Sequence, residues 1–192
     1  MHCATLCVEM RRLALITLLA ALLGGCGDDG PKSEAPPAAE VDRALEGSPG
    51  PLARLHDQEN ELLGGGPDAF ESRLAELKGY PVVVNKWASW CGPCRAEFPF
   101  FQKQALAKGR KIAFMGVNSN DNDGAAERFL REYPVPYPSY RDPDSKIAQV
   151  FNAVAAFPAT AYYDAKGKLA YVRQGGYGTE QQLAEDVDRY AR

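Results

Sequence analysis

Histidine is nearly absent from this chain of 192 residues, which contains only His2 and His56. Beyond His56, no imidazole is available for a Ser-His-Asp triad, a Cys-His dyad or a metal site held by histidines. The scarcity of histidine therefore excludes these three kinds of site from the larger part of the chain.

An excess of positive charge is also missing. The chain has 22 Lys and Arg residues against 25 Asp and Glu residues, a net charge of −3. A broad nucleic-acid interface needs clustered basic residues to attract phosphates, so the sequence does not predict a nucleic-acid partner. With 45% hydrophobic and 24% charged residues, the composition is typical of a globular domain.

The chain lacks an apolar run long enough to cross a membrane. Leu13–Leu23 spans only eleven residues, whereas a transmembrane helix needs about 20. Two arginines precede this run and two glycines follow it, an order typical of a secretory signal peptide, here residues 1–25. Because Met10 begins a complete basic region, we expect translation to start there, which would leave out Cys3 and Cys7.

Residues 23–26, Leu-Gly-Gly-Cys, resemble the lipobox of bacterial lipoproteins. The resemblance implies that Cys26 is diacylated, becomes the mature N-terminus and anchors the protein to the cell membrane on its extracytoplasmic face. Two acyl chains would anchor it stably, since each buried CH₂ group contributes about 0.8 kcal/mol. The alternative is ordinary signal cleavage near Gly25, with no special role for Cys26.

Residues 26–66 are predicted to be the lipidated cysteine followed by a flexible acidic tether. Gly27–Gly66 contains seven glycines, five prolines, nine acidic and three basic residues. Helix breakers and low apolar content are typical of a weakly ordered segment. Leu52–Leu63 is the one stretch that favours a short helix or strand, and His56 is expected to be solvated.

Residues 67–192 carry regular hydrophobic patterns that predict an α/β domain with helices covering a mixed sheet. Apolar residues at i, i+4 and i+7 indicate a helix at Phe70–Leu77, and the run Pro81–Val84 indicates a central strand buried on both faces. The other predicted elements are a helix at 95–108 containing Pro99, a strand at 112–117, a helix capped by Asp123, a short helix at 147–151, a hairpin of 159–163 and 169–173, and a helix capped by Thr179.

Two cysteines lie between the central strand and the next helix, in the motif Trp90-Cys91-Gly92-Pro93-Cys94. A helix N-terminus carries about half a positive charge and unpaired N–H groups, which stabilise a thiolate. Cys91 is therefore predicted to be the nucleophile. Cys94, one turn further on, is predicted to attack the mixed disulfide and release the product.

A structural disulfide and a zinc site are the alternatives for this pair. A bridge across two residues closes a very small loop and restrains the unfolded chain little. Zinc needs further ligands, and residues 67–192 contain no other cysteine and no histidine. The spacing, the strand–helix context and the export signal together favour dithiol redox chemistry, with no metal and no cofactor.

The segment Val82–Pro99, with the sequence VVVNKWASWCGPCRAEFP, resembles the active-site block of TlpA/ResA-type thioredoxin-like proteins. Phe157-Pro158-Ala159-Thr160 resembles their second hallmark, a cis-proline loop that faces the cysteines. The stretch between the two motifs matches the βα insertion of that family. The resemblance covers residues 67–192 and implies a thioredoxin-like fold and the activity of an exported, membrane-tethered thiol–disulfide oxidoreductase.

The resemblance also implies roles for individual residues. Pro158 would belong to the catalytic site, and the substrate would contact Trp90, Gly92, Pro93 and Phe157. Glu97 fits the family pattern Cys-x-x-Glu-x-Pro and either tunes proton transfer or favours the first helical turns.

Three residues of the same block differ in what they indicate. Asn85 occupies the position where thioredoxins carry a buried acid, so that acid is missing here. Trp87 is expected in the core. Lys86 replaces a common aromatic residue and, by strand alternation, points to the face opposite Asn85 and Trp87.

The leading functional hypothesis is a lipoprotein that reduces disulfides of exported proteins. The resemblance implies a membrane thiol donor of the DsbD/CcdA type, and it offers cytochrome c maturation or general thiol repair as roles. A disulfide oxidase or isomerase with the same residues is the alternative. A copper chaperone on this fold would need Cys-x-x-x-Cys spacing and a distant histidine, and a peroxidase would need a third cysteine. The domain has none of these.

Overall fold

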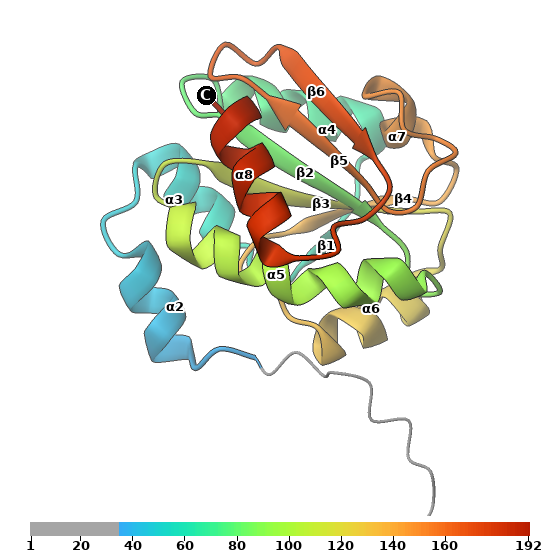
Figure 1. The fold of residues 1–192 in the computed structure, drawn as a ribbon, viewed down its shortest axis with the longest axis horizontal. Helices are drawn as coiled ribbons and strands as arrows, with labels where there is room; N and C mark the ends of the chain where they lie inside the picture. The colour runs from blue at the N-terminus through green and yellow to red at the C-terminus, as the bar shows by residue number, and fades with distance from the viewer. Residues whose placement is uncertain (1–34) are drawn as a thin grey trace, which may run out of the picture. The chain divides into compact units, whose positions relative to one another are not determined.

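A six-stranded mixed β-sheet organises the computed structural model, which describes residues 35–192 (Figure 1). The strands are β1 (Leu62–Leu63), β2 (Val82–Trp87), β3 (Ala113–Ser119), β4 (Ser139–Asp142), β5 (Ala159–Tyr163) and β6 (Leu169–Gln174). The helices are α2 (Ala38–Leu45), α3 (Gly50–His56), α4 (Gly66–Glu76), α5 (Gly92–Lys108), α6 (Asp123–Glu132), α7 (Lys146–Val150) and α8 (Glu180–Tyr190). Within this part of the chain, no helix is long and apolar enough to cross a membrane. The predicted signal peptide and Cys26 lie outside the described residues.

The strand order of the sheet is β1-β4-β3-β2-β5-β6. β1, β4, β3 and β2 are parallel to one another, whereas β5 pairs antiparallel with both β2 and β6. Every residue of β2 is buried, as a central strand covered on both faces requires. The predicted α/β class, the mixed sheet and the β5–β6 hairpin are confirmed.

Helices cover both faces of the sheet, so the side chains of β2 enter two separate cores. Val83 and Trp87 pack with residues of α5, α6 and α8, whereas Val82 and Val84 pack with residues of α4 and α7. Figure 1 shows α5 and α8 on one side of the sheet and α4 and α7 on the other. Because side chains alternate along a strand, Lys86 points to the side of α4 and α7.

Two helices begin differently from the sequence prediction. α5 starts at Gly92 rather than at residue 95, because the missing N–H of Pro93 is no loss in a first helical turn. The N-cap of α6 is Asn122, whose Oδ1 accepts a hydrogen bond from the Ala125 backbone N–H over 3.0 Å. Asp123, the predicted cap, is the first helical residue.

The folded domain begins well before Pro67 and includes much of the predicted tether. Leu52 and Leu55 of α3 are fully buried in the core on the side of α4 and α7, and β1 pairs with β4. Residues three apart lie on the same face of a helix, so these two leucines dock α3 although glycine and proline surround it. The prediction of a flexible segment is therefore wrong for α2 and the start of α3, whereas the short helix or strand expected within Leu52–Leu63 is confirmed by α3 and β1.

His56, at the end of α3, is half-buried rather than solvated. Burial lowers the pKa of its imidazole, against the opposing effects of Asp57 and the backbone of Gly109. Gly109 follows α5 directly. His56 lies beside the end of α5 because α3 packs against the domain, and the sequence did not reveal this packing.

Candidate active site

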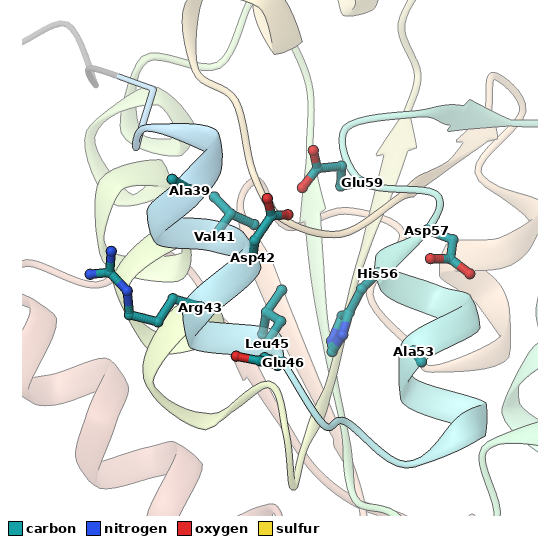
Figure 2. A pocket seen from close by; sticks show the side chains of 10 residues that line it. All are labelled: Ala39, Val41, Asp42, Arg43, Leu45, Glu46, Ala53, His56, Asp57 and Glu59. Carbon is teal, nitrogen blue, oxygen red and sulfur yellow. The ribbon is translucent and has the colours of Figure 1, made fainter.

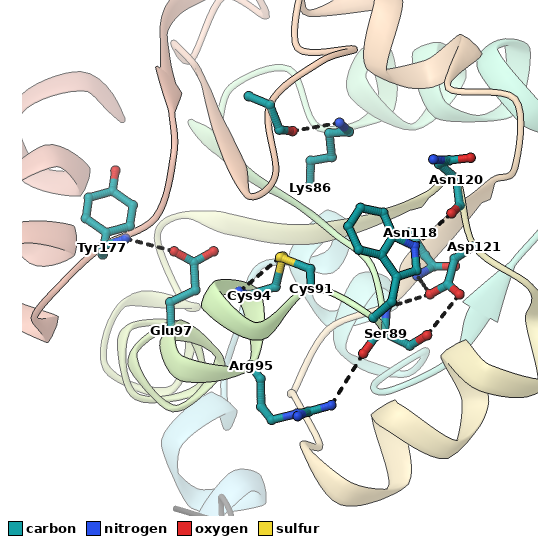
Figure 3. The surroundings of a disulfide bond; sticks show 12 residues. Lys86, Ser89, Cys91, Cys94, Arg95, Glu97, Asn118, Asn120, Asp121 and Tyr177 are labelled. Atoms are coloured by element: carbon teal, nitrogen blue, oxygen red, sulfur yellow. Dashed lines mark hydrogen bonds between the residues drawn. A yellow bond between two sulfur atoms is a disulfide. The ribbon is translucent and has the colours of Figure 1, made fainter. Parts of the chain in front are cut away.

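The two cysteines form a disulfide at the start of α5 (Figure 3). Cys91 is the N-cap of the helix, and its Sγ accepts a hydrogen bond from the Cys94 backbone N–H over 3.1 Å. Cys91 keeps a small exposed fraction of 4%, whereas Cys94 has none, and Gly92 and Pro93 between them are exposed. Cys91 is therefore the sulfur that an incoming molecule can reach.

The surroundings of Cys91 favour a thiolate only moderately. The N-terminus of α5 provides the positive end of a helix dipole, and the first turn of α5 carries no acidic residue. Arg95, the nearest cation in sequence, turns away: its Nη2 donates to the Ser89 carbonyl over 3.4 Å, and its guanidinium carbon lies 5.8 Å from the Tyr133 ring centroid. The helix terminus is thus the main source of positive potential at Cys91.

The second predicted motif lies beside the disulfide. The Phe157–Pro158 peptide bond is cis, as expected from the resemblance, and leads directly into β5. The Phe157 ring packs against the ring of Trp90, with 4.8 Å between their centroids. Trp90 is 56% exposed, so these two aromatic side chains form an apolar surface next to Cys91.

Glu97, on α5, is fully buried. Its Oε2 accepts a hydrogen bond from the Tyr177 backbone N–H over 3.0 Å, while its Oε1 has no hydrogen-bond partner within residues 35–192. A Cβ atom on Gly176 would lie 3.2 Å from Pro158 Cγ and 3.3 Å from Glu97 Oε2, so the carboxyl group and the cis-proline share one small space. Burial raises the pKa of Glu97 to about 8, against the Tyr177 hydrogen bond and the charge of Arg173.

Other buried polar groups gather on the same side of the sheet as Glu97. The side chains of Asn85, Tyr137 and Thr160 are buried there, and a hydrogen bond with the Asn85 side chain opposes the effect of burial on the pKa of Tyr137. Asn85 and Thr160 are paired residues of β2 and β5, and the charge of Glu97 raises the pKa of Tyr137 further above the effect of burial. The sequence pointed to Asn85 and, through the cis-proline motif, to Thr160, but it gave no signal for Tyr137, which comes from a distant segment.

A loop that the sequence did not single out holds the active-site segment in place (Figure 3). The Asp121 carboxylate accepts hydrogen bonds from the Ser89 N–H over 2.6 Å and the Ser89 Oγ–H over 2.9 Å, and from the Asn118 Nδ2 over 2.9 Å. The Trp90 Nε1 donates to the Asn120 carbonyl over 2.9 Å. Thirty or more residues separate these partners, so only the adjacency of β2 and β3 brings them together.

A pocket of about 760 Å³ lies elsewhere, between α2 and α3 (Figure 2). Acidic side chains, among them Asp42, Glu46 and Glu59, line it together with His56, and none of its lining residues belongs to the disulfide site. Within residues 35–192, no group of three or more His, Cys, Asp and Glu side chains is placed to hold a metal ion. This pocket and the disulfide are therefore separate features of the described chain.

A helix N-terminus capped by one cysteine, a second cysteine one turn later and a neighbouring cis-proline loop define a thioredoxin-fold dithiol protein. The chain belongs to the Redoxin family, whose model matches residues 48–188. It is a thiol–disulfide oxidoreductase of the TlpA/ResA type.

Individual relatives agree with this family. The thiol:disulfide interchange protein HelX of Rhodobacter capsulatus is 34% identical over 76% of this chain and 76% of its own. The thiol-disulfide oxidoreductase ResA of Bacillus subtilis is 29% identical over 68% of each chain. The crystal structure of a secreted Mycobacterium tuberculosis disulfide oxidoreductase, homologous to Escherichia coli DsbE, superposes with a TM-score of 0.54 at 27% identity, covering 60% of this chain and 85% of that one.

Proposed function

We propose that this protein is a membrane-tethered reductant of disulfides in exported proteins. The observation that carries the proposal is the disulfide at the start of α5, with the more accessible sulfur, Cys91, beside the aromatic surface of Trp90 and Phe157. An exposed apolar edge of this kind suits a polypeptide segment better than a small molecule, which proteins usually enclose.

The reaction starts from the reduced dithiol. The Cys91 thiolate attacks one sulfur of the substrate disulfide, forms a mixed disulfide and releases the other substrate sulfur as a thiolate. Cys94 then loses its proton and attacks Cys91, which releases the second substrate sulfur. Two electrons have passed to the substrate, and the protein is left with the Cys91–Cys94 disulfide.

In this proposal, Glu97 exchanges the proton of Cys94. It lies three residues after Cys94 on α5, its Oε1 has no hydrogen-bond partner in the described chain, and burial raises its pKa to about 8. A carboxyl group of that pKa is matched to a thiol, whose ordinary pKa is about 8.5. Proton exchange is most effective between groups of similar pKa near the working pH.

The direction of the reaction follows from how weakly the Cys91 thiolate is stabilised. A very stable thiolate makes the disulfide a strong oxidant, as in DsbA at about −120 mV, whereas thioredoxin, with the same Gly-Pro dipeptide, stands at about −270 mV. A single helix terminus stabilises a nearby charge by about 0.3–1 kcal/mol at an exposed site and by up to about 2 kcal/mol where the charge is largely buried, as the Cys91 sulfur would be. Arg95, which could have added to it, is turned toward Ser89 and Tyr133.

The cellular setting completes the proposal. Cys26 would hold the protein to the membrane through its acyl chains, and a membrane thiol donor of the DsbD/CcdA type would reduce the Cys91–Cys94 disulfide after each turnover. The substrates would be disulfide-containing exported proteins, with apocytochromes c among the options that the family offers.

The reduction potential of the Cys91–Cys94 pair tests the direction. Equilibration with glutathione buffers, read out by alkylation and mass, should give a value near about −270 mV. A value more positive than about −180 mV, the range of protein disulfide isomerase, would instead support a disulfide oxidase or isomerase and contradict the proposed reductase.

A further inference from the structure

Lys86 is a fully buried charged side chain that the redox chemistry above does not use. It stands near the end of β2, on the face opposite Asn85 and Trp87. Burial lowers the pKa of Lys86 to about 8, against the opposing charge of Asp142. Since an ammonium group leaves water only at a large cost unless strong partners replace the water, the partners of Lys86 indicate what it does.

All the close partners of Lys86 lie in one loop, between α7 and β5. Its Nζ donates to the Val154 carbonyl over 2.9 Å and to the Ala156 carbonyl over 2.8 Å. The same Nζ lies 3.4 Å from the centroid of the Phe157 ring, within the range of a cation–π interaction. Figure 3 shows Lys86 reaching this loop on the far side of β2 from Glu97.

The loop needs such a support. Residues 154–157 belong to no helix or strand, and Val154 is 45% exposed, so no strand ladder holds them. Yet this segment positions Phe157 against Trp90 and leads into the cis peptide bond at Pro158. One buried ammonium group thus connects two backbone carbonyls of the loop and its aromatic side chain to the central strand.

We propose that Lys86 is a positioning residue, which holds loop 154–157 in the conformation that receives an extended polypeptide substrate beside Cys91. The proposal rests on the thiol–disulfide exchange of the proposed function, but not on its direction. Lys86 acts through the loop and contacts neither sulfur. Its removal should therefore slow the reaction with polypeptide disulfides and leave the intrinsic reactivity of Cys91 unchanged.

The test compares two disulfides as substrates of the reduced protein. One is a disulfide-containing peptide long enough to lie along Phe157 and Pro158, and the other is bis(hydroxyethyl) disulfide, which is too small to contact the loop. Lys86→Met keeps an unbranched side chain that is one heavy atom shorter, and it removes the charge and the hydrogen-bond donors. The matched control is Lys166→Met, the same change at an exposed lysine in the β5–β6 turn.

The expected result is a difference between the two substrates. Lys86→Met should lower the second-order rate constant for the peptide about tenfold, equivalent to about 1.4 kcal/mol, with the rate constant for the small disulfide and the reduction potential unchanged. Lys166→Met should change none of the three. Equal losses with both disulfides, or no loss with the peptide, would overturn the proposal. If the reduction potential of the Cys91–Cys94 pair is in the oxidant range and Lys86→Met still slows only the peptide reaction, the protein is not a reductant but Lys86 does position the loop.

A measurement on the unaltered protein covers the case in which Lys86→Met does not fold. A buried, hydrogen-bonded ammonium group exchanges its protons slowly and gives a nitrogen-15 NMR signal that solvated lysines lack. We expect one such signal with nuclear Overhauser contacts to the Phe157 ring protons. Its absence would show that Lys86 does not hold the loop.

Discussion

The carboxyl group of Glu97 on α5 accepts a hydrogen bond from the backbone N–H of Tyr177, 80 residues further along the chain. This bond connects the active-site helix to the loop between β6 and α8, and it occupies one oxygen of a carboxyl group that is otherwise surrounded by protein. The raised pKa of Glu97, about 8, follows from that burial.

Glu97→Gln should change the pH dependence of stability. The pKa of Glu97 rises from an unperturbed 4.5 to about 8 in the folded protein, so between these pH values unfolding releases its proton. The free energy of unfolding of the wild type should therefore fall as pH increases, by at most about 1.4 kcal/mol per pH unit from this group, and level off above pH 8.

The glutamine side chain of the Glu97→Gln variant does not titrate and keeps an oxygen for the Tyr177 hydrogen bond. The stability of Glu97→Gln relative to the wild type should therefore increase from pH 5 to pH 8, as measured by urea unfolding of the oxidised proteins. Glu132→Gln, at an exposed position of α6, is the control and should follow the wild type. A constant difference between Glu97→Gln and wild type across this range would mean that Glu97 is ionised throughout.

The two cysteines should differ in what they trap. Cys94→Ser leaves Cys91 able to attack but removes the group that resolves the mixed disulfide, so substrates should accumulate bound to Cys91. Cys91→Ser should trap little, because Cys94 is fully buried. Non-reducing gels of each variant after reaction with a disulfide-containing peptide measure the adducts. Equal trapping by both variants would reverse or abolish the assigned roles.

Asp121→Ala should loosen the segment before Cys91. The variant leaves the Ser89 N–H and the Asn118 side chain without their acceptor, and a lost hydrogen bond to a charged group costs about 1.5–3 kcal/mol. We expect a loss of that order in urea unfolding of the oxidised protein. Asp144→Ala removes an exposed carboxylate that contacts Lys146 and should change stability by less than about 0.5 kcal/mol. Similar values for the two variants would contradict a supporting role for Asp121.

Cys26 should be lipidated, and residues 1–25 should be absent from the mature protein. The intact mass of protein extracted from the native membrane fraction measures both. A species cleaved at another residue, with a free Cys26 thiol, would disprove the membrane anchor while leaving the redox site unaffected.

Much of the redox site could be predicted from local sequence. A cysteine that caps a helix, a second one turn later and a proline in the first turn are determined by residues within five positions of each other, as Cys91, Pro93 and Cys94 show. The continuous apolar run of β2 likewise predicts a central strand with both faces covered, without indicating which helices cover them. The sequence pattern therefore indicated the nucleophile, its partner and the class of fold.

The segment before Pro67 shows where local patterns are insufficient. Composition predicted a flexible tether with a short helix or strand only within Leu52–Leu63, and it gave no sign that Leu52 and Leu55 of α3 are fully buried in a core whose other members lie far along the chain. β4 was missed for a related reason: prolines at 134, 136 and 138 precede it, and only its pairing with β3 and β1 makes it a strand.

The sequence by itself determined the chemistry of this protein, because Cys91 and Cys94 are neighbours in the chain and a helix N-terminus acts within one turn. Only the tertiary structure decided the pKa of the neighbouring carboxyl group and the conformation of the loop beside the cysteines. The pKa of Glu97 depends on burial beneath Tyr177, and the loop before Pro158 depends on Lys86, which reaches it from a strand 68 residues earlier. Burial and long-range hydrogen bonds are properties of the packed chain, and no short sequence pattern contains them.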